Sequence, residues 1–346
     1  MSPSTSSPAA TAPAGAPAPT ATKKRRSPFA GAAGRNAGLV VAFALLCVVG
    51  FVTGGERFAS VSNLLTVLSL ASIIGVLSIG MTFVITTGGI DLSVGAVMGL
   101  ASVWATTLAT QQMAMDTHWS VMVLTALAVG LVAGLVNGAL VAYGKVVAFI
   151  TTLAMMAAAR GLAEMISNRQ TQRVRVKPFL DFFGSDVLGV PMLVWIFALV
   201  SAAGWILLNR TTFGRRTVAV GGNPEAARLA GIDVRRHTMY VYGLAGLTAG
   251  IGAVMMLVRT TAGTSTHGSM YELDAIAAVV VGGTLLIGGR GTIVGTVLGV
   301  LIFTTLTNVF TLNNLSTSAQ AVAKGIIIVA AVLLQQHLAR RSRSTT

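Results

Sequence analysis

The fold is decided by NLLTVLSLASIIGVLSIGMTFVI, residues 63–85, in which 23 consecutive residues carry no charge. A helix needs about 20 mainly apolar residues to cross the roughly 30 Å hydrocarbon core of a bilayer. Working outward, similar apolar runs occupy residues 37–53, 94–111, 119–142, 146–166, 190–208, 239–258, 272–288, 293–311 and 318–337. The sequence therefore predicts an all-α, polytopic membrane helix bundle of about ten transmembrane helices.

The composition agrees with a membrane protein. Of the 346 residues, 54% are hydrophobic and 10% are charged, and the mean hydropathy is +0.79. Soluble domains have about a quarter charged residues, so little of the chain is left for a soluble enzyme domain. The single cysteine, Cys47, excludes an intrachain disulfide and a Cys-based metal cluster.

The ends of the chain differ from its middle. Residues 1–36 are rich in Pro and Ala and then basic, which predicts a disordered N-terminal tail. Residues 37–337 form the predicted membrane domain, with a cytoplasmic loop at 209–238, and residues 338–346 a basic cytoplasmic tail. The first apolar run lies too far from the N-terminus for a cleaved signal peptide, so we expect it to be a retained span.

The net charge of +14 is interpreted as a topology signal. With ten spans and a cytoplasmic N-terminus, most of the 24 Lys and Arg residues fall on inner segments, as the positive-inside rule requires. This predicts a multi-pass protein of the plasma (inner) membrane, in contact with the lipid bilayer, with both termini in the cytoplasm. Because the basic residues are scattered over separate loops, they do not indicate a nucleic-acid partner. A nine-span count stays open. It applies if the two runs divided only by residues 288–291, or the two divided by residues 143–145, form a single span, and it would put the termini on opposite sides of the membrane.

Two segments resemble each other at an offset of 200 residues. GGIDLSVGAVMG at 88–99 and GGRGTIVGTVLG at 288–299 share Gly-Gly followed by Val-Gly-x-Val-x-Gly. This is the trace that a duplication leaves in a pseudo-symmetric bundle, although chance similarity between glycine-rich apolar sequences explains it equally well. Glycines four residues apart, such as Gly130 and Gly134, predict close helix packing in lipid.

The 209–238 loop contains GGNPEAARLAGI, which has the signals of a short helix. Asn223 is the predicted N-cap, Pro224 the first helical residue, and Gly231 the C-terminal stop. A helix of seven residues is marginal in water on its own, so it needs a groove or partner to hold it. Arginines on both sides are equally consistent with simple membrane anchoring and with partner docking.

Charged and polar side chains inside the spans are candidates for function. Arg160 and Glu164, four residues apart, are predicted to pair and lock one helix in place. Asp91 is predicted to cap the helix that follows it, and with Gly88 and Gly89 it is assigned a structural or gating role. The candidate pathway residues are polar groups suited to a sugar, namely Thr82, Thr86, Trp104, Asn137, Thr151 and Asn308.

Four ordered blocks resemble one family. GMTFVITTGGIDLSVGAVMGL, TLAMMAAARGLA, GRRTVAVGGNPEAARLAGI and YELDAIAAVVVGGTLLIGGRGTIVGTVLG are similar to the membrane permease subunit of ribose-type, monosaccharide-importing ATP-binding cassette (ABC) transporters, over residues 38–337. The resemblance implies a pair of permease chains, an extracytoplasmic substrate-binding protein and a separate ATPase subunit. It also implies that the short helix is a coupling helix for that ATPase, formed by Asn223, Pro224, Glu225, Ala226, Ala227, Arg228 and Gly231.

The chain lacks the nucleotide-binding loop G-x-x-x-x-G-K-[ST]. We therefore expect no catalytic, cofactor or metal site here, and ATP and Mg²⁺ to be bound by the partner subunit. Four basic residues of the outer 167–189 loop run against the positive-inside bias and are expected to dock the binding protein: Arg169, Arg173, Arg175 and Lys177. The alternative function is a self-sufficient, ion-coupled secondary carrier.

Overall fold

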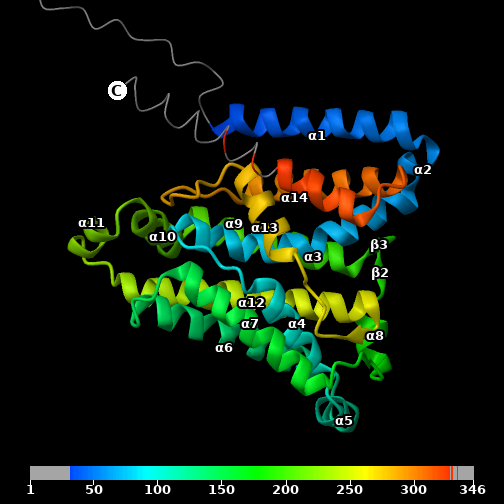
Figure 1. Ribbon diagram of the computed structural model, residues 1–346, viewed down its shortest axis with the longest axis horizontal. Helices are drawn as coiled ribbons and strands as arrows, with labels where there is room; N and C mark the ends of the chain where they lie inside the picture. Colours follow the sequence, from blue (N-terminus) through cyan, green and yellow to red (C-terminus); the bar gives the residue numbers. More distant parts are fainter. Residues whose placement is uncertain (1–31, 328, 330–332, 334–346) are drawn as a thin grey trace, which may run out of the picture.

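The protein is a bundle of helices that lie roughly along one direction (Figure 1). The computed structural model describes residues 32–327, 329 and 333. Seven helices are long and apolar enough to cross a membrane, among the residues so described. They are α1 (Ala32–Gly54), α3 (Val61–Thr86), α6 (Ser120–Ala142), α7 (Ala148–Ser167), α9 (Met192–Arg210), α12 (Val234–Thr260) and α14 (Ile293–Leu312). All seven lie within a few residues of predicted runs, so the all-α membrane bundle is confirmed.

Shorter elements connect these helices. They are α2 (Glu56–Ala59), α4 (Val94–Ala105), α5 (Leu108–Asp116), α8 (Lys177–Phe183), α10 (Thr212–Gly222), α11 (Pro224–Leu229) and α13 (Tyr271–Val281). The four strands have two residues each: β1 (Gln172–Arg173) pairs antiparallel with β4 (Ala262–Gly263), and β2 (Asp186–Val187) with β3 (Val190–Pro191). α11 lies at one end of the bundle, and α5 and α8 lie at the other (Figure 1).

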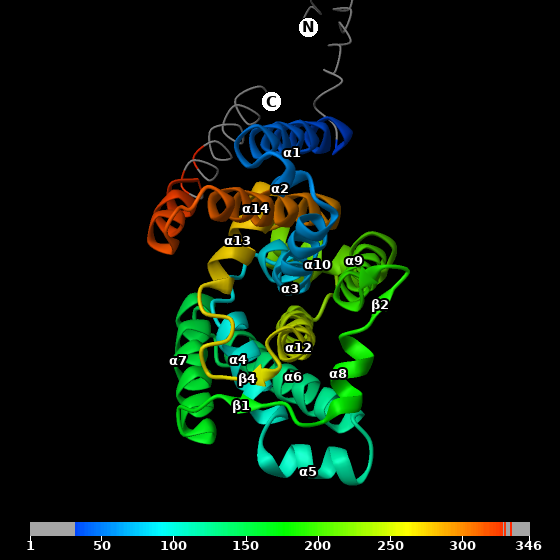
Figure 2. The same ribbon diagram turned by 90° about the vertical axis from the view of Figure 1, so that its right-hand side faces the viewer.

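α12 lies at the centre and packs against α3, α4 and α6 (Figure 2). The glycines on the facing sides of α6 and α12 allow the closest approach. A Cβ added to Gly134 would lie 2.9 Å from the Gly246 Cα, and one added to Gly250 would lie 2.9 Å from the Leu127 Cα. Backbones this close gain dispersion contacts that lipid cannot replace, as the glycine spacing predicted.

Two predicted spans are not continuous helices. The run at 94–111 breaks after Ala105, where α4 ends, and Thr107 begins α5 as its N-cap by accepting from Thr110 N. The run at 272–288 contains only α13, which ends at Gly282; Gly283 follows with a φ of 90°. Hydropathy alone misplaced both ends, because the apolar sequence continues beyond the hydrogen-bonded helix.

The two ends of the chain are only partly described. α1 begins at Ala32, within the expected tail of residues 1–36, and residues 1–31 lie outside the described part. Within the predicted run 318–337, residues 317–327 are helical; the rest of that run, apart from 329 and 333, and the predicted tail 338–346 lie outside the described residues.

Candidate functional site

The tip of the bundle is formed by α11, the predicted short helix. Asn223 is its N-cap and accepts a hydrogen bond of 3.0 Å from Ala226 N to its Oδ1. Pro224 occupies the first helical position, and Glu225 and Arg228 form an ion pair of 2.5 Å on its exposed surface. The hydrogen bond and charge of Arg228 lower the pKa of Glu225. Gly231 ends the helix with a φ of 82°, a left-handed conformation suited to glycine.

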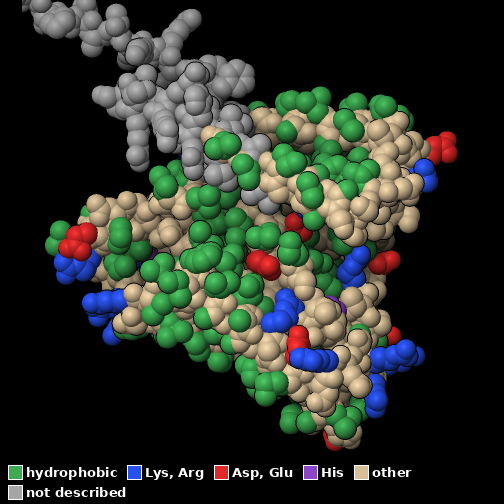
Figure 3. Space-filling model, viewed as in Figure 1, with side chains coloured by type: hydrophobic (Ala, Val, Ile, Leu, Met, Phe, Trp, Pro, Cys, Tyr) green, Lys and Arg blue, Asp and Glu red, His purple; other side chains and the backbone are tan. Residues whose placement is uncertain are grey.

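The helix has six residues rather than the predicted seven, and its surroundings differ from the expected loop. Arg215 and Arg216 lie on a second helix, α10, which sequence reasoning treated as flanking chain. α11 buries Ala227 against the protein and leaves Leu229 78% exposed. α10 and α11 together form a bent arm whose tip extends beyond the neighbouring helices (Figure 1), and charged side chains gather at that tip (Figure 3).

The inner end of this arm touches both copies of the internal repeat. A Cβ added to Gly221 would overlap the Thr86 carbonyl and lie 2.6 Å from Gly289 N. Gly289 N also donates a hydrogen bond of 2.9 Å to that Thr86 carbonyl. A Cβ added to Gly288 would lie 2.7 Å from Gly221 O and 2.9 Å from Gly88 N. We call these backbones, residues 86–89, 221–222 and 288–291, the glycine junction.

Gly88 and Gly89, assigned to gating with Asp91, thus lie within the glycine junction. Asp91 is fully buried, but it is not the N-cap of α4 as predicted. Its Oδ1 accepts from Ser93 N at 2.8 Å and from Ser93 Oγ at 2.6 Å, and Ser93 is the cap residue. The carboxylate therefore orders the turn that leads from the junction into α4. Asn137, predicted as a pathway residue, also belongs to this turn, because its Nδ2 donates to Ser93 Oγ at 2.8 Å.

The structure does not bring the candidate pathway residues to one place. Thr82 Oγ1 lies 2.8 Å from Thr296 Oγ1, between α3 and α14, and Thr86 is one turn further along α3. Asn308 exchanges hydrogen bonds of 2.7 and 3.1 Å with Asn63, also between α14 and α3. These contacts hold helices together within one chain.

The remaining pathway candidates lie elsewhere. Asn137 and Thr151 are buried on α6 and α7, and Asn137 Oδ1 and Thr151 Oγ1 have no hydrogen-bond partner among the residues that the structure describes. Trp104, expected in the middle of a span, is next to the last residue of α4 and is 44% exposed. The residue lies in the middle of the predicted run 94–111 but at the end of the helix, because α4 ends at Ala105.

The predicted pairing of Arg160 with Glu164 is wrong. Arg160 Nη1 instead donates to the carbonyl oxygens of Ser265 and His267, in the extended segment that joins α12 to α13. Glu164 pairs with Arg169 at 3.0 Å. The Arg160 side chain thus donates to backbone carbonyl groups that form no hydrogen bond within a helix or sheet. Leaving such carbonyl groups unpaired costs more free energy than losing an exposed i,i+4 ion pair.

Two acidic residues of α13 have surroundings that the sequence did not reveal. Glu272 is buried, its Oε2 has no hydrogen-bond partner within the described part of the chain, and a Cβ added to Gly95 of α4 would lie 2.5 Å from that atom. Asp274 forms an ion pair of 3.0 Å with Lys324, with side chains 14% and 20% exposed. An acidic residue within an apolar run indicates a structural or functional role. The pairing of Asp274 with Lys324 could not be predicted, because the two residues are 50 positions apart in the sequence.

The four basic residues of the outer loop are all exposed, and three of them share one face. Arg173, Arg175 and Lys177 alternate with the buried Val174 and Val176, so the three charges point away from the protein. The backbone beneath is fixed by Gln111, which accepts from Arg175 N at 2.7 Å and donates to Arg173 O at 3.1 Å. Arg169 is exposed beside them. Positive side chains are visible near α8, at the opposite end from α11 (Figure 3).

No group of three or more His, Cys, Asp or Glu side chains that could hold a metal ion was found among the described residues. The candidate functional features are therefore α11, the glycine junction and the exposed basic residues of the outer loop.

Comparison with known proteins gives a consistent result. Residues 63–332 match the family described as "Branched-chain amino acid transport system / permease component". The ribose import permease protein RbsC of Escherichia coli (strain K12) is 40% identical over 296 residues, covering 84% of this chain and 91% of that protein. RbsC of Bacillus subtilis (strain 168) is 39% identical over 317 residues, covering 91% of this chain and 97% of that protein.

A relative with a different printed substrate is also similar. The L-arabinose transport system permease protein AraH of Escherichia coli (strain K12) is 35% identical over 318 residues, covering 89% of this chain and 92% of that protein. No solved structure matches.

Proposed function

The chain belongs to the permease family described as branched-chain amino acid transport system / permease component, and from this we propose that it is the membrane subunit of an ATP-driven sugar importer. It is a multi-pass membrane protein and a transport component rather than an enzyme. A separate ATPase would bind ATP and Mg²⁺, and an extracytoplasmic binding protein would deliver a monosaccharide of the ribose or arabinose kind. Two permease chains would enclose the path.

The observation that carries this proposal is the form of α11. A six-residue helix is too short to be stable alone in water, yet this one is capped at both ends and leaves the apolar side chain of Leu229 78% exposed. A short capped helix with an exposed apolar residue suits a cleft on a second protein. The ion pair between Glu225 and Arg228 would keep the helix formed when the ATPase moves.

Force on α11 would reach the membrane through the glycine junction. α10, which precedes α11 in the chain, would move together with α11. Its Gly221 lies directly against Thr86 and Gly289. These backbones precede α4 and α14, so a shift of α10 would move the starts of both helices. Contact between backbones, with no flexible side chain between them, favours a rigid transfer of motion.

The opposite end of the bundle suits the binding protein. Arg169, Arg173, Arg175 and Lys177 are exposed there, on a backbone fixed by Gln111. Acidic residues on the binding protein would make docking faster and sensitive to salt. α11 would then face the cytoplasm and, because α1 begins at the α11 end of the bundle (Figure 1), so would the N-terminus.

Substitution at Ala226 tests the coupling role. Ala226→Pro removes the N–H that bonds to Asn223 Oδ1 and disrupts the helix, whereas Ala226→Ser keeps that N–H. In proteoliposomes containing the permease, its ATPase and its binding protein, we expect Ala226→Pro to abolish ATP-driven uptake and Ala226→Ser to retain it. Normal uptake by the Ala226→Pro complex would overturn the assignment of α11.

A second pair of variants tests docking without transport. Leu229→Asp places a charge on the exposed tip, and Leu188→Asp does the same at an 88% exposed leucine in the turn between β2 and β3. We expect only Leu229→Asp to weaken co-purification of the ATPase, by about tenfold or more, as loss of a buried apolar anchor does at interfaces. Equal retention of the ATPase by both variants would contradict docking through α11.

Neutralising the outer basic residues tests docking of the binding protein. With Arg169, Arg173, Arg175 and Lys177 all changed to Gln, we expect weaker binding at low salt and a loss of its salt dependence, measured by surface plasmon resonance on the reconstituted complex. Unchanged affinity and salt dependence would show that the binding protein docks elsewhere.

A further inference from the structure

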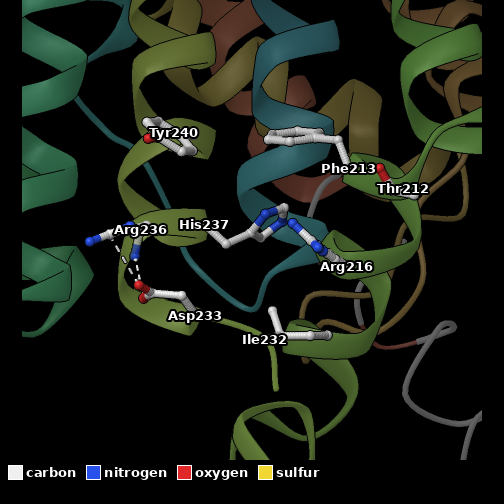
Figure 4. A pocket seen from close by; sticks show the side chains of 8 residues that line it. All are labelled: Thr212, Phe213, Arg216, Ile232, Asp233, Arg236, His237 and Tyr240. Atoms are coloured by element: carbon white, nitrogen blue, oxygen red, sulfur yellow. Dashed lines mark hydrogen bonds and ion pairs between the residues drawn. The ribbon is translucent and has the colours of Figure 1, made fainter. Parts of the chain in front are cut away.

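A cavity lies beside the arm that carries α11, between α10 and the start of α12 (Figure 4). Its volume is about 420 Å³, within the usual range for small-ligand sites. Phe213 and Arg216 of α10 face His237 and Tyr240 of α12 across it, and Ile232 and Asp233 close the end nearest α11 (Figure 4). None of these residues belongs to the glycine junction.

The polar part of the cavity favours an anion. It holds two guanidinium groups, of Arg216 and Arg236, against one carboxylate, of Asp233. Asp233 and Arg236 engage each other, because they pair at 3.2 Å and Asp233 accepts from Arg236 N, so Arg216 supplies the net positive charge of the cavity. Arg216 has no ion-pair partner among the residues that the structure describes. α10 also begins at the cavity, with Thr212, and the start of a helix attracts negative charge.

A second hollow continues from the first along the membrane-spanning helices. It has a volume of about 310 Å³ and shares Phe213 and Tyr240 with the first. Its other lining residues are Leu131, Leu135, Leu207, Gly243, Leu244 and Leu247, from α6, α9 and α12. An apolar groove thus begins where the charged cavity ends.

The length of the combined site fits one leaflet. Arg236 and Leu247 are 11 residues apart on α12, or about 16 Å at 1.5 Å per residue. Half of a hydrocarbon core of roughly 30 Å is about 15 Å. A soluble protein does not reach this far along a spanning helix, whereas an acyl chain does.

We propose that the two hollows together bind one anionic phospholipid, with its phosphate against Arg216 at the start of α10, in the cavity that Arg236 also lines, and an acyl chain in the leucine groove. Basic pockets between helices at the cytoplasmic surface suit such head groups. The bound lipid would bridge α10 and α12 and thereby hold the arm at a fixed angle. This binding does not depend on which solute is carried or on what drives the transport.

The test is lipid binding by the purified full chain. The delipidated protein is titrated with phosphatidylglycerol or with phosphatidylcholine of the same acyl chains, and bound lipid is counted by native mass spectrometry. We expect one phosphatidylglycerol to bind about tenfold or more tightly than phosphatidylcholine. Equal binding of the two lipids, or no retained lipid, would overturn the proposal.

Matched arginine variants separate a site from general attraction. Arg216→Gln with Arg236→Gln removes both cavity charges, while Arg215→Gln with Arg235→Gln removes the same charge from their sequence neighbours, which do not line the cavity. We expect about a tenfold loss of phosphatidylglycerol binding in the first pair and less than about twofold in the second. Equal losses in both pairs would show diffuse attraction and contradict the proposal.

The apolar half needs its own variants. Leu131→Trp fills the edge of the groove, and Leu124→Trp adds the same group to an exposed position of α6 outside it. Only Leu131→Trp should weaken phosphatidylglycerol binding, and each variant is first shown to be folded by its melting temperature. If soluble glycerol 3-phosphate displaces the lipid at the lipid's own concentration, the site binds a free anion and the lipid assignment fails.

The ATPase is the competing occupant of this surface. Phosphatidylglycerol that stays bound when the ATPase assembles with the permease supports the proposal. Its release on assembly would show that the protein partner covers the cavity, and would overturn the bridging role.

Discussion

The two copies of the repeated segment both turn a corner at a glycine of positive φ, Gly88 and Gly288, but the helices before and after that corner differ in length. At 88–99 the corner leads from the 26-residue α3 into α4, which has 12 residues. At 288–299 it follows α13, which has 11 residues, and leads into the 20-residue α14. Each corner thus joins one full helix and one half-length helix, in reverse order.

The difference shows what the shared glycines do. A Cβ on Gly99 of α4 would lie 2.8 Å from the His267 carbonyl oxygen, and one on Gly295 of α14 would lie 2.9 Å from the Gly282 carbonyl carbon. In both copies, a glycine therefore lies very close to backbone atoms of the segment between α12 and α14. A repeated motif here encodes close backbone contact with one central segment, while the lengths of the neighbouring helices are free to differ.

The strongest way to break both corners together is Gly221→Ala. The new Cβ would overlap the Thr86 carbonyl and crowd Gly289 N, and backbone cannot move aside as a side chain does. We expect a loss of about 3 kcal/mol or more of stability and no measurable uptake. Gly222→Ala is the control, since its Cβ would have only Gly289 Cα at 4.0 Å. Melting temperature and proteoliposome uptake measure both, and equal behaviour of the two variants would contradict the junction.

Alanine at the matching corner positions sharpens the comparison. Gly88 and Gly288 have φ values of 82° and 84°, so alanine strains both by about 1 kcal/mol. At Gly288 the Cβ would also meet Gly221 O at 2.7 Å, whereas at Gly88 the nearest atom is 3.7 Å away. We expect Gly288→Ala to cost about 2–3 kcal/mol and Gly88→Ala about 1 kcal/mol. The reverse order in melting temperature would show that the corners are not arranged this way.

The two half-length helices, α4 and α13, are held by different interactions. Within the described residues only α13 is held by an ion pair, so a substitution that removes a charge of that pair affects α13 and not α4. α13 is tied to residues 317–327 by Asp274 and Lys324, while the turn before α4 is tied by the uncharged donors of Ser93 and Asn137. Lys324→Gln leaves a largely buried carboxylate alone and should cost about 2 kcal/mol, and adding Asp274→Asn should recover part of it. A double variant less stable than Lys324→Gln would show that the ion pair is not the tie.

The smallest effect is expected between the full helices. Thr82 and Thr296 join α3 to α14 through hydroxyl oxygens 2.8 Å apart. Each change to Val should cost about 1 kcal/mol or less, with a coupling of about 0.5 kcal/mol between the two in a double-mutant cycle. Zero coupling would mean that each hydroxyl serves only its own helix.

Local signals were sufficient for much of this molecule. Seven spans followed from apolar length, and α11 followed from Asn223, Pro224 and Gly231, whose effects act within a few residues. α4 and α13 were misjudged because apolar sequence continues past Thr106 and Gly282, where the helices end.

Contacts between distant residues were beyond reach. Arg160 satisfies carbonyls about a hundred residues away in sequence, at Ser265 and His267, and the nearby Glu164 offered a simpler but wrong partner. The pathway residues stay a prediction, and the structure shows why such residues are hard to choose from sequence. A threonine such as Thr86 can bond to its own helix, as it does to Thr82 O, so a polar residue in a span does not by itself indicate a solute.

The most direct test of the account is uptake of labelled ribose and arabinose by proteoliposomes, with and without the ATPase and binding protein. We expect accumulation only when the permease, both partners and ATP inside the cytoplasmic compartment are present. Accumulation by the permease alone, driven by a proton or sodium gradient, would contradict an ATP-driven importer and favour a secondary carrier.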